Sequence, residues 1–144
     1  MAIDLVAPYD KLVALLTALP GMQKVYEGVP ETLVRGVNAY IAVTAQELVD
    51  RYAGGVLENT ATFFVGLTYA VRSNDQESTE RALLAALVEL MRALVAARKS
   101  DLDGTVESLT WDFSLANDPA YTVSANREFR IFPVLIRVKQ TDNL

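Results

Sequence analysis

Apolar residues recur at helical spacing in two segments of the chain. In residues 4–19 the repeat is carried by Leu5, Tyr9, Leu12, Val13, Leu16 and Leu19. A Pro-Gly pair follows, so we predict an amphipathic helix there. After the polar connector RSNDQES, the repeat is carried by Leu83, Leu84, Leu87, Val88, Met91, Leu94 and Val95. This wide stripe predicts a helix of about five to six turns that ends in KSDLDG. We expect four of its residues to pack beneath a sheet: Leu83, Leu87, Met91 and Leu94.

Four other segments alternate between apolar and polar residues, as β-strands do. They are residues 37–43, 62–71, 105–115 and 127–139. Pro133, in the last segment, lacks the N–H that a sheet ladder needs, so we expect it at an edge or a bulge. Residues 22–36 contain two glycines and a proline, which predicts an irregular segment with at most a brief strand. Residues 116–126 predict a loop.

The segment from residue 44 to residue 55 allows two structures. Thr44 and Glu47 have capping-box spacing, which favours a short helix. The apolar residues that follow them suit an extended ribbon equally well. Gly54 and Gly55 then mark a turn.

These elements together predict the fold class. We expect an α+β fold in which an antiparallel or mixed sheet of about four strands packs against two main helices. A chain of 144 residues has the usual size of one domain, so we expect a single domain over residues 1–144.

The composition removes the side chains that most familiar enzyme mechanisms use. The chain contains no His and no Cys, which excludes the commonest general base and the thiolate ligands of zinc. Its net charge of −5 opposes close binding along phosphate backbones. Its apolar runs are too short to span a bilayer, and its N-terminus lacks the pattern of a signal peptide. We therefore expect no enzymatic activity, no catalytic or cofactor-binding residues, no metal site, no cofactor and no membrane span.

The segment DLDGTVESLTWD invites comparison with a calcium-binding loop. Asp101, Asp103, Thr105 and Asp112 fall at EF-hand-like offsets, but Val106 stands where that loop needs glycine. Because Asp and Gly are also the usual turn formers, we interpret the segment as a helix-to-strand turn.

Two further patterns have a structural and a functional interpretation. The glycine-rich YAGGVLEN lacks the lysine of a phosphate-binding loop, so a hairpin or mobile loop is the better interpretation. Trp111, Phe113 and Tyr121 would suit a binding platform, but an aromatic stripe on an amphipathic strand usually belongs to the core.

The candidate interface residues are three arginines and two glycines. Arg127, Arg130 and Arg137 would suit contact with an acidic partner, or they protect an edge strand from aggregation. Gly54 and Gly55 mark the turn that would accompany them at a subunit or partner contact.

The order of elements carries a family resemblance. An N-terminal helix precedes LPGMQKVYEGVPETLVRGVNAYIAV, the strand TFFVGLTYAV, the long helix and a closing FRIFPVLIRVKQ. This pattern, over residues 12–139, resembles the tail terminators, or tail-completion proteins, of long-tailed bacteriophages. The segment TAQELVDRYAGGVLENTA departs from the family and is either a tube-facing loop or a β-ribbon.

The resemblance implies an α+β subunit of a hexameric ring on the end of the tail tube. The ring ends tube polymerisation and joins the tube to the head-proximal connector. It implies a homo-hexamer with the tail tube protein and the head–tail connector protein as partners, and DNA that passes through the lumen without specific binding. The location would be the virion tail, and the host cytoplasm during assembly. The alternative is a small-molecule-binding or enzymatic α+β domain with a cleft between helix and sheet.

Overall fold

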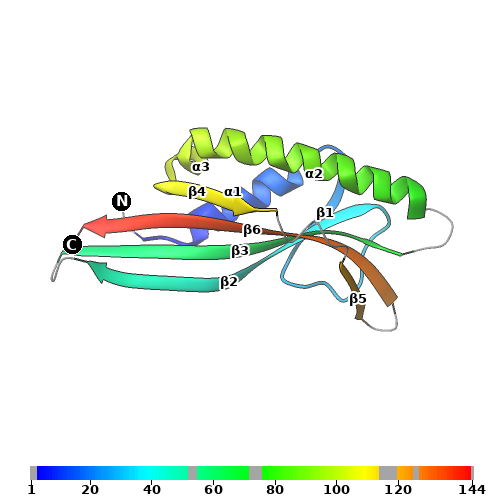
Figure 1. The fold of residues 1–144 in the computed structure, drawn as a ribbon, viewed down its shortest axis with the longest axis horizontal. Coiled ribbons are helices and arrows are strands. Elements are labelled where there is room, and N and C mark those ends of the chain that lie inside the picture. The colour runs from blue at the N-terminus through cyan, green and yellow to red at the C-terminus, as the bar shows by residue number, and fades with distance from the viewer. Residues whose placement is uncertain (1–2, 52–54, 72–75, 114–119, 125–126, 144) are drawn as a thin grey trace.

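The fold is a mixed sheet with helices on one face (Figure 1). It was obtained as a computed structural model that describes residues 3–51, 55–71, 76–113, 120–124 and 127–143. The helices are α1 (Val6–Thr17), α2 (Gln76–Lys99) and the short α3 (Asp101–Gly104). The strands are β1 (Met22–Glu27), β2 (Val37–Arg51), β3 (Val56–Ala70), β4 (Ser108–Asp112), β5 (Ala120–Ser124) and β6 (Arg127–Asn143).

The sheet has the strand order β1-β2-β3-β6-β4, and β5 also pairs with β6. β1 runs parallel to β2, while the other pairs are antiparallel. The predicted α+β class and the mixed sheet against two main helices are therefore confirmed. The sheet has more strands than expected, because β1 and β5 add to the four predicted from alternation.

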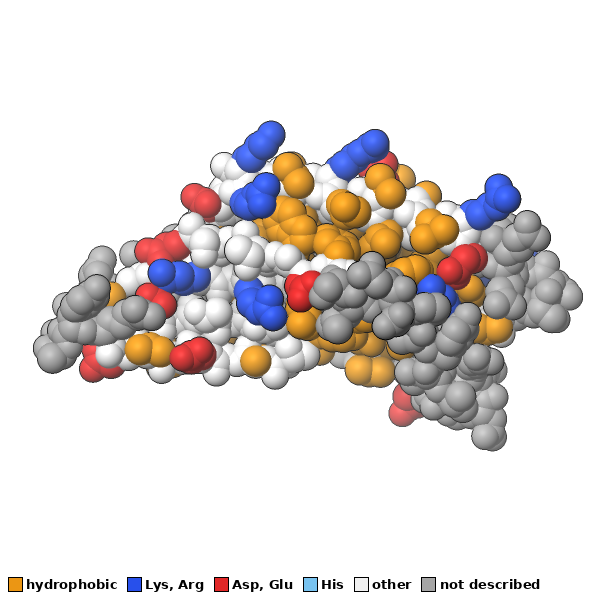
Figure 2. Space-filling view, in the orientation of Figure 1, with side chains coloured by type: hydrophobic (Ala, Val, Ile, Leu, Met, Phe, Trp, Pro, Cys, Tyr) orange, Lys and Arg blue, Asp and Glu red, His pale blue; other side chains and the backbone are white. Residues whose placement is uncertain are grey.

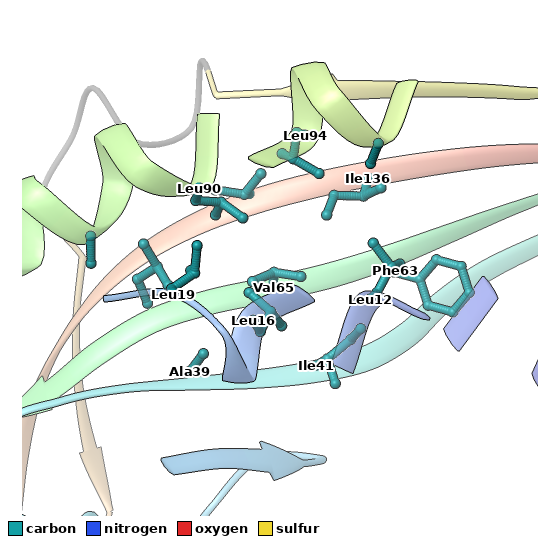
Figure 3. Packing of buried hydrophobic residues seen from close by; sticks show 14 of the residues in the cluster. Leu12, Leu16, Leu19, Ala39, Ile41, Phe63, Val65, Leu90, Leu94 and Ile136 are labelled. Carbon is teal, nitrogen blue, oxygen red and sulfur yellow. The ribbon is translucent and has the colours of Figure 1, made fainter. Parts of the chain in front are cut away.

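The core lies between the helices and the face of the sheet to which the odd-numbered side chains of β3 point. Residues 59, 61, 63, 65, 67 and 69 of this strand are all buried, whereas several of their even-numbered neighbours are only half-buried. In Figure 3, Leu94 of α2 lies over Ile136 of β6. Leu16 of α1 lies beside Val65 of β3. Both helices thus bury their apolar faces on the same side of the sheet.

The buried face of α2 differs from the expected one. Leu83 and Leu94 are fully buried as predicted, but Met91 is 45% exposed and Leu87 is half-buried. Leu90 lies at the centre of the contact instead, together with the small residues Ala86 and Ala97. Because α2 carries apolar residues around most of its circumference, the stripe that includes alanines can approach the sheet most closely, and Met91 turns outward.

Two structures were open for the segment from residue 44, and its residues 44–51 form an extended ribbon. β2 continues from Val37 to Arg51 and pairs with β3 as far as the Arg51–Val56 pair. The register shifts between Val43 and Ala45, and the hydroxyl of Thr44, the extra residue, donates a hydrogen bond to the carbonyl of Thr62 at 3.3 Å. The chain remains a strand on both sides of this bulge. The capping-box spacing of Thr44 and Glu47 therefore does not start a helix.

Two predictions about the C-terminal half have different outcomes. The loop predicted over residues 116–126 is wrong for Ala120–Ser124, because these residues form β5 along β6. Pro133 lies between the β5 ladder, which reaches Ile131, and the β4 ladder, which begins at Leu135. Neither strand pairs with Pro133, so its missing N–H breaks no described ladder on that side. On the other side Pro133 lies opposite Gly66 of β3 without a register shift, so the predicted edge or bulge is met on one side of β6 only.

The burial of α2 generates a test with two adjacent positions. Leu90→Asp places a carboxylate in the fully buried contact, at a cost comparable with a total stability of about 5–15 kcal/mol. We expect this variant to show no cooperative thermal transition by circular dichroism. Met91→Asp is solvent-exposed and should stay within roughly 1 kcal/mol of the parent. The reverse order of stabilities would contradict the observed orientation of α2.

Candidate interaction surfaces

The outer edge of β2 is the longest exposed backbone edge of the sheet. β1 pairs with β2 only from Val37 to Ile41. From Ala42 to Arg51 the outer edge has no strand partner within the described part of the chain. Every side chain from Val43 to Leu48 is exposed, and the ends of β2, β3 and β6 extend past the helices (Figure 1). We call residues 43–51 the free edge.

The free edge carries only part of the protection that isolated edges usually have. Proteins commonly protect such edges with lysine, proline or a bulge. Here the bulge at Thr44 lies at one end, and no lysine or proline follows it. The charged side chains described along it are Glu47 and Asp50, both exposed. The bulge and these two charges protect the edge in part, and its exposed backbone can still add a strand from another chain.

A second surface is the outward stripe of α2. Leu84, Val88 and Met91 are 47%, 47% and 45% exposed, and Figure 2 shows hydrophobic side chains gathered along this part of the molecule. Their spacing of four and three residues places them on one side of the helix. This stripe accounts for part of the high hydrophobic fraction of the sequence.

A groove of about 600 Å³ lies between α1 and the end of α2. Its floor is formed by small and apolar residues: Ala14, Leu15, Ala18, Ala93 and Ala96. Lys11 bridges to Asp103 at 3.2 Å, and Arg92 bridges to Glu89 at 3.0 Å. These exposed ion pairs add little stability. All four residues line the groove, where they form a polar rim around its apolar floor.

Arg130, one of the predicted interface residues, lies inside the molecule. It is 4% exposed, and its guanidinium pairs with Glu80 of α2 at 3.3 Å and lies 4.1 Å from the centre of the Phe132 ring. Tyr69 donates a hydrogen bond to the same carboxylate at 2.6 Å. This cluster fastens the first turns of α2 to β3 and β6, so Arg130 offers no exposed cation to a partner.

The other predicted interface residues fall elsewhere. Arg137 is exposed and lies beside Thr110 of β4 in the sheet register. Arg127 begins β6, but its side chain lies outside the described residues, as does Gly54. Gly55 is described and half-buried. Whether these residues contact a partner stays a prediction.

The aspartates and aromatic residues singled out in the sequence have structural positions. Asp101 to Gly104 form α3, whose residues Asp101, Leu102 and Asp103 have left-handed backbone angles. This agrees with the predicted helix-to-strand turn. In the described ranges, no group of three or more acidic residues is placed to hold a metal ion.

Two of the aromatic residues singled out in the sequence lie against the core. The Arg98 guanidinium lies 4.7 Å from the centre of the Trp111 ring, and Trp111 and Phe113 pack against the core. The side chain of Tyr121 is outside the described residues.

Two tyrosines have shifted ionisation. Burial raises the pKa of Tyr40 above its ordinary value of 10.0. Burial also raises the pKa of Tyr9, with a smaller contribution from the nearby carboxylate of Glu27. Both hydroxyls therefore stay protonated at neutral pH. In the described part of the chain, no helix has the length and apolar character needed to cross a membrane.

Comparison with known proteins leaves the family of the chain open. No family model and no curated protein matches it. Among solved structures, a chain of the "Virion of native gene transfer agent (GTA) particle" is similar, with 17% identity and a TM-score of 0.48. The similarity covers 96% of this chain and 93% of that one. A likeness of this degree carries no argument about function.

The two arginines of β6 give a matched test. Arg130→Gln leaves Glu80 without its buried partner and should lower the free energy of unfolding by about 3 kcal/mol. Arg137→Gln removes an exposed charge and should change it by less than about 0.5 kcal/mol. Urea denaturation of both variants measures the difference. Equal effects would show that Arg130 is not a structural residue.

Proposed function

We infer that the chain is a structural subunit of a phage-like virion, and more specifically a tail terminator. In this proposal its copies close into a hexameric ring on the end of the tail tube. The ring ends tube polymerisation and joins the tube to the head-proximal connector. The order of helices and strands on which the resemblance rests supports this function, because the described elements follow that order.

The free edge of β2 is the observation that carries the proposal. A strand edge of this length is a surface for adding strands from another chain. The opposite side of the sheet ends in β4, which pairs only with β6 among the described strands. One subunit therefore presents two different edges. A contact between unlike surfaces repeats from copy to copy, and it forms a ring when the rotation between copies closes.

One pair of charges near the two edges is complementary, although the β4 edge also carries Asp112 on the same face. Glu47, on the free edge, lies opposite Thr60 of β3, and Arg137 of β6 lies opposite Thr62. Because side chains alternate along a strand, Thr60 and Thr62 share a sheet face, so Glu47 and Arg137 are on that face as well. If β2 of one copy pairs with β4 of the next, the acidic edge approaches Arg137. Such pairing sets register more than affinity.

The other surfaces fit this assembly. The outward stripe of α2 offers apolar contact area to the tube or the connector. The net charge of −5 suits a lumen through which DNA moves, because phosphates are not held by counterion release. The alternative function needed a cleft between helix and sheet, whereas the large groove lies between α1 and the α2–α3 region.

Electron microscopy of tail tubes assembled with and without the protein tests the proposal. The parent chain should place a ring at one end of each tube and stop its growth. The variant Gln46→Lys with Leu48→Lys puts two cations on the free edge, where lysine opposes strand addition. It should fold normally and leave tube ends bare.

A matched control separates the edge from a general effect of charge. Thr17→Lys with Thr32→Lys adds the same two charges at exposed positions away from the free edge, and it should cap tubes like the parent. Tubes of unchanged length that carry no ring with the parent protein would refute the terminator function. Normal capping by the edge variant would refute only the role of β2.

A further inference from the structure

A small pocket lies on the sheet face opposite the helices, apart from the surfaces of the proposed ring. Its volume is about 230 Å³. The lining residues are Val29, Pro30, Leu33, Tyr40, Thr68, Phe129 and Ile131. Thr68 and Ile131 are direct neighbours across β3 and β6, which form the floor.

The path of the chain explains why a pocket forms there. β1 and β2 are adjacent and parallel, so the connection of residues 28–36 must return along the whole strand before β2 begins. α1 and α2 occupy one face of the sheet. The connection contributes Val29, Pro30 and Leu33 to the pocket on the other face. Gly28 and Gly36, at its two ends, have φ angles of 93° and 98°, which favour glycine.

Hydrogen bonds hold this wall in place without a ligand. The side-chain amide of Asn38 donates to the carbonyls of Val34 and Gly36, at 2.8 and 3.0 Å. The Tyr26 hydroxyl accepts a hydrogen bond from the Val34 amide at 3.3 Å. The wall is therefore preorganised, which lowers the cost of binding.

The Tyr40 ring is fixed as well. Its Cε1 lies only 2.4 Å from where a Cβ on Gly66 would stand, so the ring occupies space that any other residue at position 66 would fill. It stacks on Phe64 with ring centres 5.5 Å apart. Tyr40 and Phe129 thus give the pocket two aromatic walls.

Thr68 carries an unpaired polar group in the otherwise apolar lining of the pocket. It is 2% exposed, and its hydroxyl has no hydrogen-bond partner within the described part of the chain. Leaving a buried hydroxyl unpaired costs about 1–3 kcal/mol. The oxygen itself is buried, so a ligand has to turn the Thr68 side chain toward the pocket in order to pair with it and remove that cost.

We propose that this pocket binds one aromatic ring with a hydroxyl at its edge, the chemistry of a phenol. The apolar walls exclude a charged group. A cavity of about 150 Å³ accepts benzene, so the observed volume has room for a ring with one small substituent, and it lies below the usual range for larger ligands. A phenolic hydroxyl can donate to Thr68 Oγ1 or accept from it. The ring comes either from a tyrosine of a partner protein or from a free small phenol.

NMR titration of the full chain with p-cresol and toluene tests the proposal, with the methyl groups of Leu33 and Val29 as reporters. We expect p-cresol to shift these signals saturably and to bind about 2- to 10-fold more tightly than toluene, the ratio that one neutral hydrogen bond supplies. Thr68→Val keeps the shape and removes the hydroxyl. It should abolish the preference for p-cresol while toluene binds as before.

Two further measurements complete the test. Ile131 is half-buried in the floor of the pocket, so Ile131→Trp fills the pocket and should abolish the shifts with both compounds. N-acetyl-tyrosinamide distinguishes the sources: binding comparable to p-cresol indicates a partner's tyrosine, and binding of p-cresol alone indicates a free phenol. The absence of saturable shifts with p-cresol, or an undiminished preference in Thr68→Val, would overturn the proposal.

Discussion

The burial of one face of β3 is the constraint on which the rest of the structure depends. Side chains alternate along a strand, so once the residues from Phe63 to Tyr69 that point toward the helices are buried, the side chains between them must face the other way. α1 and α2 can then lie only on the first face, because their apolar stripes need the same buried surface. The connection between β1 and β2 crosses the second face, where it forms the small pocket around Thr68. The ends of β2, β3 and β6 continue past the helices, and β2 keeps an open backbone edge.

Two kinds of unfinished surface follow from this arrangement. The free edge of β2, residues 43–51, has no strand partner on its outer side in the described structure, and the stripe of α2 around Val88 exposes apolar side chains. A chain that works alone usually protects such surfaces. A subunit of an assembly leaves them for its neighbours, which connects the fold with the proposed ring more directly than any single side chain does.

The sequence predicted the elements with a strong local pattern and failed where distant contacts decide. Alternation identified the first half of β2, the second half of β3, all of β4 and most of β6. It did not identify β5, which follows Asn117, Asp118 and Pro119, the usual residues of a turn. The bulge at Thr44 shifts the alternation of β2 by one residue, which is why the segment after it also suited a helix. The orientation of α2 was missed because apolar residues lie around most of the helix. Leu90 is no more hydrophobic than the half-buried Leu87, and Ala86 and Ala97, which share its buried side, carry a weak hydrophobic signal. The burial of Arg130 could have been predicted from alternation. Arg130 is an even-numbered residue of β6, like Phe132, Val134 and Ile136, so its side chain lies on the same apolar face. Arg137 is odd-numbered and lies on the other face. The hydroxyl of Thr68 had no sequence signal, since its burial depends on a crossing connection.

In the proposed ring, the free edge of β2 becomes a paired strand when copies assemble. Amide hydrogen exchange measured residue by residue tests it directly. In the isolated chain, the amides of residues 45–51 that point away from β3 should exchange rapidly, while those bonded to β3 are protected. On capped tail tubes, the outward amides should slow by orders of magnitude and match their neighbours. Exchange at these outward amides that stays as fast on the tube as in the free chain would contradict the account.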